Sequence, residues 1–193
     1  MPTACMTLIL ALLAGGLAGC GGQSEDAPRA NPYGGPETVL ETNRSSQEVY
    51  DDFRSAADAA VQASAAPEAW ATENDSPWAV ERDLPVMAGP CPSVEYRDGP
   101  WQFKQQLLSP GTDDPQGNRD RIRRHFEDRG MTVVSAFDPQ PHERPDAPWT
   151  VTARGQNGSL IDFSANSTTQ GLVVYSECSR HPSMQEEVSP ASP

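Results

Sequence analysis

The chain has 193 residues, and its 27 Asp and Glu against 14 Lys and Arg give a formal net charge of -13 at pH 7. This acidity excludes a basic surface for a phosphate backbone, so we expect no nucleic-acid partner. It also excludes electrostatic attraction to anionic lipid headgroups, and the length suits one domain with flexible ends.

An apolar run over residues 6–17 leads into the sequence Leu17-Ala18-Gly19-Cys20. The run is too short to span a hydrocarbon core, which needs about 20 residues, but it has the length of a signal-peptide core. A cysteine directly after Leu-Ala-Gly resembles the lipobox of bacterial lipoproteins, which implies cleavage before Cys20 and a diacylglycerol on its thiol. We therefore predict a signal peptide over 1–19 and a lipid-anchored protein on the extracytoplasmic face of the cell membrane. A plain secretory signal with a chance cysteine is the alternative.

The other cysteines form a natural pair. With Cys5 in the signal peptide and Cys20 lipidated, Cys91 and Cys178 are left in an oxidising compartment, where disulfides persist. A bond between them would stabilise the domain by roughly 4–5 kcal/mol in the chain-entropy model. A metal site or a reactive thiol is the alternative, but there is no C-x-x-C, and three histidines lack ligand spacing: His125, His142 and His181. We expect no metal and no cofactor.

Composition divides the mature chain into three parts. Residues 20–44 are rich in Gly, Pro and acidic side chains, cannot offset their ordering entropy, and are predicted to form a disordered tether. Residues 45–179 carry the periodic apolar patterns of a folded extracytoplasmic domain. Residues 180–193 are polar and are predicted to form a flexible tail.

The first predicted helix runs from Ser45 to about residue 65. Ser45 and Glu48 have the spacing of a capping box, and apolar residues follow at helical intervals. The apolar face is rich in alanine and includes Val49 and Phe53, which indicates close packing against a sheet.

A second helix is predicted from Pro115 to Arg129, with Asp114 as its N-cap and Gly130 as its C-terminal cap. This helix carries the basic run of the chain. We interpret the run as a solvated face, with a phosphate or glycan-acid site as the alternative. It comprises Arg119, Arg121, Arg123, Arg124 and Arg129.

Period-two apolar patterns separated by turn signals predict an antiparallel meander. Asn157-Gly158 is the signal for a tight hairpin. Strands are expected over residues 94–96, 101–108, 131–137, 149–154, 160–163 and 172–178. The expected fold class is α+β, with two helices packed on one face of a small mostly antiparallel sheet and one disulfide.

Three tryptophans are candidate contact residues. Trp70 and Trp78 lie in the irregular stretch 67–90, and Trp101 begins the strand predicted over 101–108. Because aromatic anchors dominate recognition surfaces, we interpret all three as possible ligand or partner contacts. The alternative is that they fill the end of a small core.

The features follow a recognisable order along the chain. After the lipobox and tether come a helix ending in Ala65-Ala66-Pro67-Glu68-Ala69-Trp70, then Cys91, a second helix from Ile122 to Gly130, and a strand meander through Gly158 to Cys178. This order resembles that of the LppA-type lipoproteins of actinobacteria, over roughly residues 45–178. The resemblance implies a small α+β extracytoplasmic domain and brings no catalytic residues with it.

Sequence motifs of the common enzyme classes are absent. The chain has no G-x-S-x-G, H-E-x-x-H, P-loop or G-x-G-x-x-G, so we expect no catalytic residue and no enzymatic activity. The first hypothesis is a lipoprotein that binds another envelope protein. The alternative is a carrier or sensor of a small apolar or amphipathic ligand, held between the sheet and the Ala-rich helix. An envelope hydrolase is a third, less favoured hypothesis, and the sequence does not determine the oligomeric state.

Overall fold

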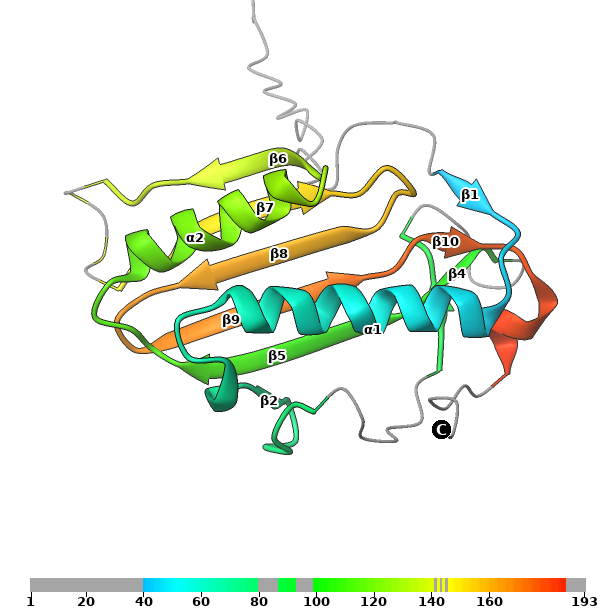
Figure 1. Ribbon diagram of the computed structural model, residues 1–193, viewed down its shortest axis with the longest axis horizontal. Helices are drawn as coiled ribbons and strands as arrows, with labels where there is room; N and C mark the ends of the chain where they lie inside the picture. The colour runs from blue at the N-terminus through cyan, green and yellow to red at the C-terminus, as the bar shows by residue number, and fades with distance from the viewer. Residues whose placement is uncertain are drawn as a thin grey trace, which may run out of the picture. The chain divides into compact units, whose positions relative to one another are not determined.

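The computed structural model describes residues 40–79, 87–92, 99–140, 142, 144 and 146–186 (Figure 1). Several predicted features lie outside these residues. They are the signal peptide, the lipidated Cys20, the tether up to residue 39, the strand over 94–96 and the tail from residue 187.

Both predicted helices are confirmed. Helix α1, Ser46–Ala63, begins at a complete capping box: the Ser45 hydroxyl accepts from the Glu48 amide, and the Glu48 carboxylate accepts from the Ser45 amide at 2.9 Å. Helix α2, Pro115–Asp128, begins where the Asp114 carboxylate accepts from the Gly117 amide at 2.9 Å. Each cap satisfies backbone donors that the first turn of a helix leaves without partners.

A six-stranded sheet with antiparallel pairing throughout forms the second layer, and Figure 1 shows both helices on the same side of it. Its strand order is β2-β5-β9-β8-β7-β6. The strands are β2 Ala71–Thr72, β5 Lys104–Pro110, β9 Thr169–Tyr175, β8 Leu160–Ala165, β7 Trp149–Arg154 and β6 Thr132–Phe137. The α+β class predicted from the sequence is therefore confirmed.

A second, four-stranded sheet corrects the expectation of a single sheet. Its order is β1-β10-β4-β3, and its pairing is mixed because β1 runs parallel to β10. Its strands are β1 Glu41–Thr42, β10 Cys178–Ser179, β4 Trp101–Gln102 and β3 Gly89–Pro90.

Two long predicted strands cross from one sheet to the other. The strand expected over 101–108 is divided into β4 and β5 at Phe103, and the one expected over 172–178 is divided into β9 and β10. At the crossing, the Phe103 amide donates to the Ser176 hydroxyl at 2.9 Å, and the Ser176 amide donates to the Phe103 carbonyl at 3.0 Å. An alternating pattern cannot reveal such a break, because side chains keep alternating through it.

The core lies between the helices and the six-stranded sheet. The rings of Tyr50 and Phe103 meet edge to face with centroids 5.5 Å apart, and both side chains are fully buried. From α2, Ile122 and Phe126 are also fully buried. On the Ala-rich face of α1, Ala57 and Ala60 are buried in the same core.

The disulfide closes the four-stranded sheet, and the last described residues pack onto the core. Cys91 and Cys178 are bonded, 87 residues apart in sequence, which confirms the predicted pair. Beyond residue 179, where we placed the end of the domain, Pro182–Gln185 forms a short 3-10 helix, and its Met184 is fully buried. Another 3-10 helix, Pro67–Ala69, follows α1. The folded domain therefore includes β1, which lies in the predicted tether, and the first residues of the predicted tail.

Candidate functional site

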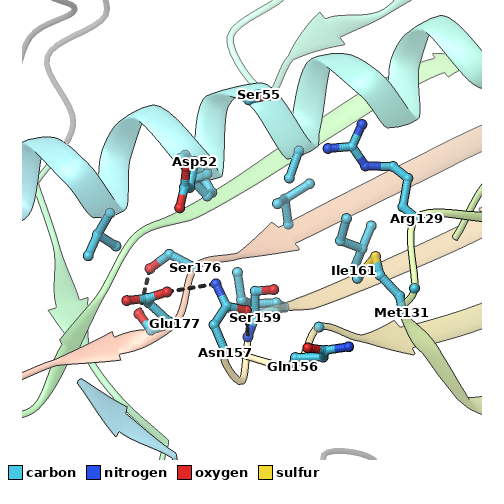
Figure 2. A pocket seen from close by; sticks show the side chains of 17 residues that line it. Asp52, Ser55, Arg129, Met131, Gln156, Asn157, Ser159, Ile161, Ser176 and Glu177 are labelled. Atoms are coloured by element: carbon cyan, nitrogen blue, oxygen red, sulfur yellow. Dashed lines mark hydrogen bonds between the residues drawn. The ribbon is translucent and has the colours of Figure 1, made fainter. Parts of the chain in front are cut away.

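A cleft of about 480 Å³ opens between α1 and the six-stranded sheet, as Figure 2 shows. Its walls come from the middle of α1, the end of α2, the turn between β7 and β8, and the end of β9. The volume falls within the range of about 300–1,000 Å³ that is typical of small-molecule sites.

The cleft lies where α2 ends beside the middle of α1. The two helices run antiparallel: the Ala65 amide, just after α1, donates to the side chain of Asn118 near the start of α2, at 3.1 Å. At the other end of α2, Arg129 and Ala56 of α1 both line the cleft. Beyond that point α1 continues alone, and the sheet beneath it is covered by one helix instead of two (Figure 1).

A Schellman motif ends α2 and turns the chain into the cleft wall. The Met131 amide donates to the Phe126 carbonyl at 3.0 Å, and the Gly130 amide donates to the Glu127 carbonyl at 2.9 Å. Gly130 has a φ of 72°, a conformation that glycine adopts without steric cost. The motif places Arg129 and Met131 at the cleft, and the predicted C-terminal cap is confirmed.

The inner wall of the cleft is apolar. Val49 and Phe53 come from α1, and Ile161 and Val174 come from neighbouring strands of the sheet. These four side chains are at most 3% exposed, so they form a packed surface that is continuous with the core. Ala56 is half-buried at the mouth, where its small side chain leaves space.

One end of the cleft is built around the buried carboxylate of Glu177, which is 2% exposed. It accepts hydrogen bonds from the Thr42 hydroxyl at 2.8 Å, from Arg44 at 3.2 Å and from the Asn157 amide at 2.6 Å. Arg44 also pairs with Asp52 on α1 at 2.7 Å, and the two carboxylates raise the pKa of Arg44. Three segments that are distant in sequence therefore meet at this carboxylate: residues 42–44, the turn at Asn157, and Glu177 itself.

The turn between β7 and β8 supplies Asn157 to that network. The Asn157 side-chain oxygen accepts from the Ser159 amide at 3.1 Å, while its NH₂ donates to Glu177. Gly158 follows with a φ of 91°, which explains the Asn-Gly sequence. The hairpin predicted at Asn157-Gly158 is confirmed, and its asparagine also forms part of the cleft.

Arg129 dominates the opposite end. Its side chain is exposed, lines the cleft and extends toward α1 (Figure 2). Among the described residues it has no ion-pair partner, whereas Arg119 pairs with Asp120 and Asp138 at 2.7 and 2.6 Å. Burial lowers the pKa of His125, one turn earlier on α2, and repulsion from Arg129 lowers it further.

The rest of the basic run is divided between packing and local pairing. Arg119 is 3% exposed and its guanidinium lies over the Trp149 ring, 5.2 Å from the centroid. Arg121 donates to the Asn118 side chain at 3.1 Å, and Arg123 pairs with Glu127 at 3.0 Å. The run is thus not one solvated face, because helical spacing directs its members to different surroundings.

The three candidate tryptophans lie away from the cleft. Trp70 is 2% exposed, and its indole nitrogen donates to the Ser64 hydroxyl at 2.8 Å, so it is a core residue. Trp78 packs against the core with the Arg54 guanidinium over its ring, 4.2 Å from the centroid. Trp101 is half-buried in β4. Sequence reasoning named none of the cleft residues as contacts; the Asn-Gly turn and the arginine beside Gly130 were the available signals.

Within the described residues, no group of three or more His, Cys, Asp or Glu side chains is arranged to hold a metal ion. No helix in the described ranges is long and apolar enough to span a membrane.

Comparisons with known proteins give little support for an identity. No protein-family model matches the sequence, so the resemblance to LppA-type lipoproteins stays an expectation. No curated protein matches it either. Among solved structures, the chain is similar to a DUF4853 family protein from Actinomyces odontolyticus, with 13% identity and a TM-score of 0.45 over 72% of this chain and 71% of that one. This likeness is too distant to carry an argument.

Proposed function

We propose that the protein is a non-catalytic binding protein whose cleft holds a small amphipathic ligand. The single observation that carries this proposal is the cleft of about 480 Å³ between α1 and the sheet. It combines an apolar inner wall with polar groups at both ends, and ligand sites of soluble proteins have this composition.

The place of action follows from the lipobox. If Cys20 carries lipid, the domain acts at the extracytoplasmic face of the membrane, where amphipathic molecules are concentrated. The resemblance to LppA-type lipoproteins supports the same location. A partner protein in the envelope, also expected from the sequence, stays a proposal without an assigned surface.

A paired substitution on α1 tests the proposal. Ala56→Phe would fill the mouth of the cleft, whereas Gln62→Phe places the same ring on an exposed position of the same helix outside the cleft. Because alanine is the best helix former, Ala56→Phe costs the helix a few tenths of a kcal/mol more in propensity than Gln62→Phe, which is small beside the expected loss of binding. We expect Ala56→Phe to weaken binding of an amphiphile such as octan-1-ol at least tenfold and Gln62→Phe to leave it unchanged.

The measurement is ligand-observed NMR on the full chain in lipid nanodiscs, with empty nanodiscs as the blank for partitioning. Equal binding by the wild type and by both variants would show that the ligand does not occupy the cleft. Absence of binding to the wild type, tested with amphiphiles of neutral, anionic and cationic head groups, would refute the proposed function.

A further inference from the structure

We infer that the cleft selects an amphiphile with a carboxylate head group, and that Arg129 binds this head group. The inference rests on the proposed function, because it assumes that the cleft is a ligand site. It assigns a role to one member of the basic run that the fold itself does not use.

Three charged side chains line the cleft, and only one of them lacks an ion-pair partner among the described residues. These are Asp52, Glu177 and Arg129. Asp52 and Glu177 are already paired through Arg44, at 2.7 and 3.2 Å. Arg129 has no ion-pair partner among the described residues, and its guanidinium extends across the mouth toward α1 (Figure 2). A guanidinium without a partner beside an apolar wall is an incomplete site for an anion.

The shape of the Arg129 side chain suits a carboxylate. A guanidinium presents its N–H donors in a planar fork that matches the two oxygens of a carboxylate. Backbone groups hold Arg129 in place: its amide donates to the carbonyls of His125 and Glu127, and Gly130 continues the Schellman motif. The donor fork therefore projects from a fixed helix end.

The charge at the far end of the cleft also favours an anionic head group at Arg129. Asp52 and Glu177 share the single cation of Arg44, which leaves one negative charge in that cluster. Repulsion from this charge directs an anionic head group to Arg129 and leaves the apolar body of the ligand against Val49, Phe53 and Ile161. Arg129 supplies one positive charge, which neutralises a monoanionic carboxylate but leaves a dianionic phosphate with a second, uncompensated charge.

The test compares three probes of equal chain length on the full chain in nanodiscs: octanoate, octan-1-ol and octylammonium. Arg129→Gln is the variant, and Arg124→Gln is the matched control, since Arg124 is an exposed arginine of α2 that does not line the cleft. We expect wild type to bind octanoate roughly tenfold more tightly than octan-1-ol, and octylammonium no more tightly than octan-1-ol. Arg129→Gln should remove this preference, and Arg124→Gln should retain it.

A second readout separates contact from general structural damage. His125 lies one turn from Arg129, and repulsion from that arginine contributes to its lowered pKa. Octanoate bound at Arg129 should therefore raise the pKa of His125, followed by NMR of its ring protons, whereas octan-1-ol should not.

The outcomes distinguish the two proposals. If Ala56→Phe abolishes binding of all probes while Arg129→Gln binds octanoate as tightly as wild type, the ligand site stands and the role of Arg129 is refuted. Equal affinity of wild type for octanoate and octan-1-ol would refute the carboxylate preference in the same way. If no probe binds wild type, both proposals fail.

Discussion

The two ends of the helix layer differ in how their polar groups are satisfied. At the end where α1 stops and α2 begins, the Ala65 amide donates to Asn118, Asn118 donates to Gln170, and Gln170 donates to the Pro110 carbonyl at 2.7 Å. Asn118 and Gln170 are only 1% and 2% exposed. At this closed end, buried protein groups satisfy one another.

The other end is open. There α2 stops at Asp128, and Arg129 extends over a cleft without an ion-pair partner among the described residues. Glu177 is held by donors from two other segments, residues 42–44 and the turn at Asn157. The same two layers are therefore joined by buried hydrogen bonds at one end and leave a cleft at the other. The contrast shows that the point along α1 at which α2 ends determines where the cleft lies.

Removing the disulfide should have the largest effect, and it should destabilise the open end more than the closed end. Cys178 directly follows Glu177, so the bond to Cys91 supports the open end. Replacing both cysteines by serine should lower the free energy of unfolding by about 4–5 kcal/mol, measured by guanidinium chloride titration. Hydrogen exchange should accelerate more at Glu177 than at Asn118. Equal acceleration at the two residues would contradict the assignment of the disulfide to the open end.

Two asparagines offer a matched pair at the two ends. Asn118→Ala should cost about 2 kcal/mol of stability, because the Ala65 amide and the buried Gln170 side chain each lose a partner. Asn157→Ala should cost about 1 kcal/mol, because Glu177 keeps its bonds from Thr42 and Arg44. Chemical denaturation of both variants measures the two losses. A loss at Asn157 as large as that at Asn118 would mean that the open end is as tightly coupled as the closed one.

The pH dependence of His125 is the smallest expected effect. Its folded-state pKa lies below the ordinary value of 6.5, chiefly through burial and then through Arg129. The unfolded chain therefore binds more protons between the two pKa values, and this contribution to stability rises with pH across that window. Between pH 7.5 and 5, wild type should lose less than about 1 kcal/mol relative to His125→Gln. Parallel pH profiles for the two proteins would contradict the lowered pKa.

Local signals predicted the parts of the fold that depend on neighbouring residues. Ser45 with Glu48, Asp114 with Pro115, and Gly130 correctly marked the helix ends, and the Asn157-Gly158 turn was correctly placed. The disulfide was also predicted, because few cysteines were left to pair. The tryptophans were ambiguous for a physical reason: a large aromatic ring stabilises a core and a recognition surface by the same burial.

By itself, the sequence determined the two helices, the meander, the disulfide and the α+β class, since capping, periodicity and turn chemistry act within a few residues along the chain. Tertiary structure alone decided the division into two sheets, the inclusion of β1 in the fold and the location of the cleft. Those features depend on where α2 ends relative to α1 and on contacts such as Thr42 with Glu177, 135 residues apart. No local pattern encodes them, because the interacting groups become neighbours only when the helices and sheets pack together.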